Sequence, residues 1–85
     1  MSKYDPLYNF LCAEASKGAH NVPLSFEQME VILGFFLPDT ASRRSQWWGN
    51  ERGSSRHVQQ NAWINAGYET RNVDLQKKTV EFIST

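Results

Sequence analysis

The sequence predicts a single winged-helix-like α+β domain, with three or four helices and a small antiparallel sheet that ends in a C-terminal β-hairpin. The 85 residues are enough for one domain with one core. Helix start and stop signals divide residues 5–67 into short helices, whereas residues 68–83 contain two runs rich in β-branched and aromatic residues. Because an isolated two-stranded hairpin is marginally stable, the apolar segment 22–24 is expected to join it as a third strand.

The first part of the chain contains two helix starts. Asp5 followed by Pro6 predicts a helix over 5–17, with Asp5 as its N-cap. Ser25 and Gln28 have the spacing of a capping box, which predicts a second helix over 26–33 that stops at Gly34. The residues expected to face the core are Leu7, Phe10, Leu11 and Ala15 in the first helix and Phe26, Met29, Ile32 and Leu33 in the second.

A third helix is expected after Asp39, over residues 41–48, with Gly49 as its end. Adjacent helical residues lie about 100° apart around the axis, so Trp47 and Trp48 cannot both face the same core. We expect Trp48 to be the core residue and Trp47 to face outward.

The last part of the chain contains a fourth helix and the hairpin. Ser55 is expected to cap a helix over 56–66, and Gly67 to end it. The residues of this helix expected to face the core are Val58, Ala62, Trp63 and Ala66. The two strands of the hairpin are expected at 68–73 and 79–83.

The composition excludes several classes of protein. No apolar run approaches the roughly 18 residues of a membrane span, and residues 1–6 lack the apolar stretch of a signal peptide, so we expect a cytoplasmic protein without a membrane partner. Cys12 is the only cysteine, which excludes an intramolecular disulfide and a zinc site built on several thiolates. The sequence has no glycine-rich phosphate loop and no nucleophile elbow. We therefore expect no metal, no cofactor and no enzymatic activity.

The charges are unevenly distributed, although nine Lys and Arg balance nine Asp and Glu. Residues 1–38 have a net charge of −2 and residues 39–78 a net charge of +3, and all five arginines lie between positions 43 and 71. This asymmetry permits a face that binds a polyanion, although a domain without such a ligand tolerates the same pattern.

Residues 43–52 combine the chemical groups that suit nucleic acid. Guanidinium groups pair with phosphate or guanine edges, amides bond adenine edges, and exposed indoles stack on bases. The candidate contact residues here are Arg43, Arg44, Trp47, Asn50 and Arg52. The other interpretation is that both tryptophans pack in the core and the arginines are solvated.

The fourth predicted helix takes the place of the recognition helix, because the last helix before the hairpin of a winged helix meets the major groove. Its candidates for reading base edges are Arg56, His57, Gln59 and Gln60. The candidates for phosphate contact on the hairpin are Arg71, Lys77 and Lys78. The alternatives are an ordinary polar helix face and solvated lysines at a turn.

Several motifs resemble those of an uncharacterised family of small bacterial and phage-associated domains. They are Leu24-Ser25-Phe26-x-x-Met29-Glu30, Leu37-Pro38, Trp47-Trp48-x-Asn50 and Gln59-x-x-Ala62-Trp63-x-x-Ala66-Gly67-Tyr68. The resemblance covers nearly the whole chain and implies no catalytic residues. The residues that match recurring positions of the family are Arg43, Trp47, Trp48, Asn50, Gln59 and Trp63. Gln60 and Asn61 stand where smaller or basic residues are usual.

Together these observations predict a small helix-turn-helix regulator of transcription or of a mobile element that binds duplex DNA. Its fourth helix would read the bases, and the arginine and tryptophan segment would grip phosphate. The alternative is a protein–protein interaction module, an inhibitor or accessory subunit, that uses the exposed aromatic and arginine surface. Clustered arginine favours DNA, and zero net charge favours the protein partner.

Overall fold

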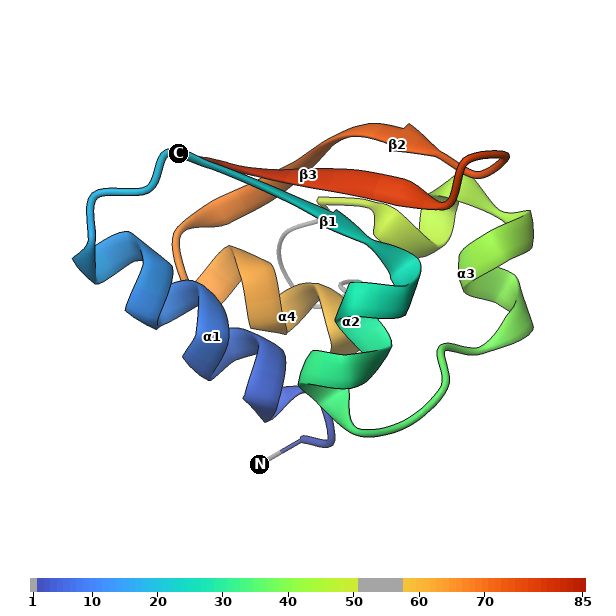
Figure 1. Cartoon of the computed structure of the whole chain (residues 1–85), viewed down its shortest axis with the longest axis horizontal. Helices are drawn as coiled ribbons and strands as arrows, with labels where there is room; N and C mark the ends of the chain where they lie inside the picture. Colours follow the sequence, from blue (N-terminus) through green and yellow to red (C-terminus); the bar gives the residue numbers. More distant parts are fainter. Residues whose placement is uncertain (1, 51–57) are drawn as a thin grey trace.

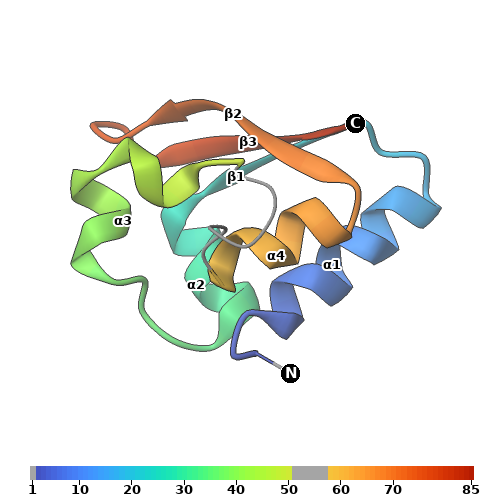
Figure 2. The ribbon, with the colours of Figure 1, turned by 180° about the vertical axis from the view of Figure 1, so that it is seen from behind.

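The computed structural model describes residues 2–50 and 58–85. The elements run in the order α1 (Asp5–Ser16), β1 (Asn21–Ser25), α2 (Phe26–Leu33), α3 (Asp39–Arg43), the 3-10 helix η1 (Ser45–Trp48), α4 (Val58–Asn65), β2 (Tyr68–Asp74) and β3 (Thr79–Ser84). The three strands form one antiparallel sheet in the order β1-β3-β2. Helices α1, α2 and α4 lie on one side of this sheet, as the two opposite views agree (Figure 1, Figure 2). The predicted α+β class, with a small sheet that includes a C-terminal strand pair, is confirmed.

The third strand of the sheet is β1, as the segment 22–24 predicts. Val22 lies opposite Phe82 and Leu24 opposite Val80, and all four side chains are buried. The intervening residues point to the other face, where the Glu81 carboxylate accepts hydrogen bonds from side-chain amides of β1 and β2. Those hydrogen bonds lower the pKa of Glu81 and keep it ionised. One face of the sheet therefore covers the core, and the other is polar.

Helix α1 begins one position earlier than the capping pattern predicts. Tyr4 occupies the N-cap position and Asp5 is the first helical residue, so the expectation that Asp5 is the N-cap is wrong. The Ser2 hydroxyl accepts a hydrogen bond from the backbone N–H of Tyr4, and the Tyr4 ring is buried in the core. Burial of this aromatic ring fixes the start of the helix more strongly than a local cap does.

Helix α2 starts and ends as predicted. The Ser25 hydroxyl accepts from the N–H of Gln28 at 3.0 Å, and the Gln28 side-chain oxygen accepts from the N–H of Ser25 at 2.8 Å. Gly34 then ends the helix at φ +83°, a left-handed conformation that glycine adopts without strain. Of its predicted inward residues, Phe26, Met29 and Leu33 are buried and Ile32 is half-buried.

Replacing Ser25 with alanine should lower the free energy of unfolding by about 0.5–2 kcal/mol, because the first turn of α2 loses its side-chain acceptor. Urea denaturation followed by circular dichroism measures the change. Ser16→Ala is the matched control, since the exposed Ser16 hydroxyl donates to a carbonyl at the end of α1. Equal midpoints for the two variants would contradict a stabilising role of the cap.

The predicted helix 41–48 is broken. Helix α3 ends at Arg43, Arg44 is extended at φ −131° and ψ +120°, and η1 follows. The break has a physical reason, because one continuous helix would direct only one of the two adjacent indoles into the core. Trp48 is 1% exposed, which confirms it as the core residue. Trp47 is half-buried and packs against the same core, so the expectation that it faces outward is wrong.

In the described part of α4, two of the four residues predicted to face the core are buried. Ala62 and Trp63 are buried, but Val58 is 51% exposed and thus does not face the core as expected. Gly67 follows at φ +88°, consistent with its predicted role as terminator. The predicted cap Ser55 and the predicted helix start at 56 lie outside the described residues.

The C-terminal hairpin forms as predicted from β2 and β3. At its turn the Asp74 carboxylate accepts from the backbone N–H groups of Gln76 and Lys77, at 3.0 and 2.9 Å. The pairing is irregular between Arg71 and Asp74, where Asn72 has a positive φ of 52°. The hairpin is therefore regular near the core and distorted toward its turn.

Candidate nucleic-acid interface

Helix α3 lies between the hairpin turn and the start of α4, so three segments distant in sequence meet at one end of the molecule (Figure 1). On one side a hollow of about 350 Å³ is shared by Asp39 and Ser42 of α3 and by Lys77 and Lys78 of the turn. On the other side a hollow of about 370 Å³ is lined by Thr40, Arg44, Gln46, Trp47 and Gln59.

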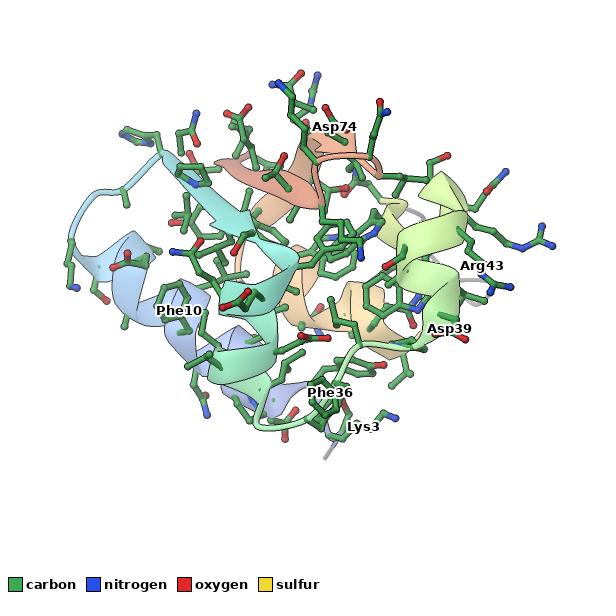
Figure 3. All side chains as sticks on the ribbon, turned by 45° about the vertical axis from the view of Figure 1, so that its right-hand side comes forward. Lys3, Phe10, Phe36, Asp39, Arg43 and Asp74 are labelled. Carbon is green, nitrogen blue, oxygen red and sulfur yellow. The ribbon has the colours of Figure 1, made fainter. Side chains whose placement is uncertain are left out.

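Four of the predicted contact residues are exposed at this end of the molecule. We call Arg43, Arg44, Lys77 and Lys78 the basic end. None of them forms an ion pair within 4.0 Å with the residues that the structure describes, where the ion pairs are Lys17–Glu14 and Arg71–Glu69. The Arg43 side chain extends away from the body of the protein (Figure 3). The basic end is therefore available to an anionic partner.

Acidic side chains lie close to the lysines of the basic end. Glu27, Glu30 and Asp39 line the same hollow as Lys77 and Lys78. These carboxylates lower the net positive potential around the lysines of the basic end.

Arg71 does not belong to the basic end. It lies on β2 opposite Glu81, and its Nε donates to the Glu69 carboxylate at 2.8 Å. This pairing holds part of its guanidinium against a carboxylate of its own strand.

Trp47 is only partly available to a ligand. Its ring packs edge-on against Tyr4 and Trp48, with centroid distances of 6.1 and 4.6 Å, and at an angle against Trp63 at 6.3 Å. The remaining surface faces the hollow that it shares with Arg44. Trp47 can therefore offer only the part of its ring that lines this hollow to a base or to a protein side chain.

Asn50 pairs with the backbone of β2. Its side-chain N–H donates to the carbonyl of Thr70 at 3.1 Å, and its side-chain oxygen accepts from the N–H of Thr70 at 2.8 Å. Because this pairing uses both ends of the amide, a role for Asn50 in reading adenine is not compatible with the structure.

Gln59 and Gln60 are buried, at 7% and 0% exposure. The Gln59 amide donates to the carbonyl of Trp47 at 3.1 Å, and the Gln60 amide donates to that of Gln46 at 3.5 Å. The expectation that they present amides to DNA bases is therefore wrong, since these amides bind η1 to α4. Their spacing is a signal for this, because they lie four and three residues before the buried Trp63.

The solvent-facing side of α4 carries other amides. Asn61 is half-buried and Asn65 is exposed one turn later. With Val58 they border a hollow of about 750 Å³, whose other wall is formed by Ser2, Asp5 and Tyr8 from the N-terminal region. Asn65 lies in the second half of α4, whereas the winged-helix pattern directs the first half of the reading helix toward the bases, so the pattern gives no signal for Asn65.

Three predicted contact residues, Arg52, Arg56 and His57, lie outside the described residues. Within residues 2–50 and 58–85 no group of three His, Cys, Asp or Glu side chains is placed to hold a metal ion. No helix in this part of the chain has the length and hydropathy to cross a membrane.

Comparison with curated proteins and with solved structures finds no match to this chain. A family model described as a domain of unknown function, DUF7662, matches residues 4–85. The match includes all eight helices and strands described above. The chain therefore belongs to the DUF7662 domain family.

Proposed function

We propose that this chain is a small duplex-DNA-binding protein of winged-helix type that regulates transcription or a mobile element. The observation that carries the proposal is the basic end, because it gathers four exposed cations from α3 and from the hairpin turn beside the first turn of α4. Exposed Lys and Arg clusters of this kind bind the phosphates of a duplex.

The element order supports this proposal. In a winged helix, a strand after the first helix pairs with the last strand of a C-terminal hairpin, and the helix before the hairpin enters the major groove. Here β1 pairs with β3 at the edge opposite β2, and α4 immediately precedes the hairpin. By analogy with a winged helix, we propose α4 as the reading helix and the β2–β3 turn as the wing.

Burial changes which amides of α4 could contact bases. Gln59 and Gln60 are internal, so Asn61 and Asn65 are the amides that α4 offers to solvent. An asparagine amide bonds the N6 and N7 positions of adenine in the major groove. Arg43 and Arg44 would then hold the phosphate backbone.

A second candidate is a protein-interaction module, such as an inhibitor or accessory subunit. The specific observation in its favour is the partly exposed indole of Trp47 beside Arg44 in one hollow, since aromatic and arginine side chains are enriched at protein interfaces. The zero net charge of the chain points the same way.

Fluorescence anisotropy with pooled random duplexes at several salt concentrations tests the DNA proposal. The double variant Arg43→Ala/Arg44→Ala should bind all sequences more weakly. The slope of the log binding constant against the log salt concentration should also become shallower by about 2, because each lost phosphate contact removes about 0.9 from that slope. Lys17→Ala is the control, since Lys17 is paired with Glu14 on α1 and should leave binding unchanged. Asn61→Ala should mainly relax sequence preference.

The result that overturns the proposal is a wild-type protein that binds no duplex at low salt. If the double variant shows the same salt dependence as the wild type, Arg43 and Arg44 do not contact phosphate, which also contradicts the proposal. If the wild type binds no duplex, the protein-interaction module becomes the better candidate. A change in the fluorescence of Trp47 on mixing with a protein partner would then test it.

A further inference from the structure

The C-terminal end of α2 exposes two large apolar side chains. Val31 is 79% exposed and Phe36, in the segment after the helix, is 87% exposed. They belong to one hollow of about 280 Å³, which is also lined by Glu27, Glu30, Gly34 and Phe35. Contiguous exposed apolar surface of this kind commonly marks an interaction site.

The shape of this surface suits a single protruding side chain. Glu27, Val31 and Gly34 recur at the spacing of one helix face, and we call these three residues the α2 stripe. Gly34 has open space where a Cβ would stand, so a notch lies between Val31 and Phe36.

The two ends of the α2 stripe carry opposite charges. The exposed Glu27 lies at its N-terminal end, where it also lines the hollow that contains Lys77 and Lys78. At the other end the Lys3 ammonium lies 5.1 Å from the ring centroid of Phe35, the residue that precedes Phe36. Because α2 rises about 1.5 Å per residue, roughly 10 Å of helix separates Glu27 from Gly34.

We propose that the α2 stripe is the interface of a homodimer, in which the α2 helices of two copies pack antiparallel about a two-fold axis midway between Val31 and Gly34. The reversed direction places Val31 of each copy in the notch over Gly34 of the other. It also carries Glu27 of each copy toward Lys3 of the other copy. Two symmetric ion pairs then flank one apolar centre, as an isologous interface requires.

Charge complementarity selects a second copy as the occupant. A uniformly basic partner would suit Glu27 but oppose Lys3, and a uniformly acidic partner would do the reverse. A second copy in antiparallel orientation supplies the required order of charges without further assumption. The apolar centre is small compared with stable dimer interfaces, so the dimer is expected to form at high micromolar concentration. The interface uses no residue of the basic end, so it does not depend on the proposed function.

Sedimentation equilibrium of the full chain, from about 5 to 500 μM, tests the proposal. The weight-average mass of the wild type should rise from that of one copy toward that of two over this range. Phe36→Ser should weaken association at least about tenfold, and its high exposure means that the fold is retained. The matched control is Val58→Ser, an exposed apolar residue on α4, which should associate like the wild type.

Charge reversal tests the antiparallel arrangement itself. Glu27→Lys and Lys3→Glu should each weaken association about tenfold, and the double variant should return to within about threefold of the wild type. A structural role within one copy would not produce this recovery, because the two residues lie at opposite ends of α2. A wild type that stays monomeric at the highest concentration overturns the proposal, as does a double variant that is not restored.

Discussion

Replacing Trp48 with alanine should lower the free energy of unfolding by about 3–5 kcal/mol, the usual cost of truncating a fully buried aromatic side chain. The indole stacks on Phe26 and on Trp63, with centroid distances of 4.7 and 6.0 Å. Its N–H donates to the carbonyl of Ala41 at 2.8 Å. The variant therefore leaves a cavity and also a carbonyl without its buried donor. Urea denaturation followed by circular dichroism measures the loss.

Two further variants separate the contributions of Trp48. Trp48→Phe keeps an aromatic ring in the stack but removes the hydrogen bond, so it should cost less than Trp48→Ala. Trp47→Ala should also cost less, because Trp47 is half-buried and already contacts solvent. A Trp47→Ala variant as unstable as Trp48→Ala would show that both indoles are equal parts of the core.

Replacing Asn50 with aspartate should destabilise the protein by about 1–3 kcal/mol at neutral pH. A carboxylate still accepts from the N–H of Thr70, but it cannot donate to the Thr70 carbonyl and repels it. The protonated carboxyl can donate, so the folded state favours protonation and the pKa of the new group is raised. Stability relative to Asn50→Ala is therefore lost as pH rises through that pKa and regained as pH falls. Denaturation midpoints between pH 4 and 7 test this sign, and a constant difference between the two variants would contradict it.

The sequence predicts best those features whose chemistry lies within a few residues. The capping box of Ser25 and Gln28, the stop at Gly34 and the hairpin turn at Asp74 each close through hydrogen bonds or dihedral angles over three or four positions. Their local energies decide the structure, so the pattern alone suffices.

The features that sequence reasoning missed depend on tertiary packing. The break at Arg44 exists because both indoles of η1 reach the core, and the burial of Gln60 exists because η1 lies against α4. The spacing of Gln60 from Trp63 indicates an inward position, but the local pattern does not identify its partner Gln46, which is 14 residues away. A polar side chain close to a buried tryptophan can form hydrogen bonds with buried backbone groups instead of with a ligand.

The residues of the candidate site also divide into those whose environment follows from local chemistry and those whose environment depends on tertiary packing. The exposure of Arg43 and Arg44 follows from their charge, and the structure agrees with it. Asn50 was assigned to DNA on residue type alone, yet a backbone partner 20 residues away uses its amide. Phe36 is 87% exposed although it lies between two other apolar residues, Phe35 and Leu37.

The pairing of Asn50 with Thr70 should also disfavour the addition of a further strand at β2. Within residues 2–50 and 58–85, β1 and β2 are the edge strands of the sheet, and edge strands can recruit strands from neighbouring molecules. On β2 the Asn50 amide occupies the polar groups of Thr70, and the irregular pairing near Asn72 distorts the strand beyond it. On β1 Pro23 has no N–H to offer. Both edges are thus poor templates for a fourth strand, so a crowded solution of this protein should resist fibril growth.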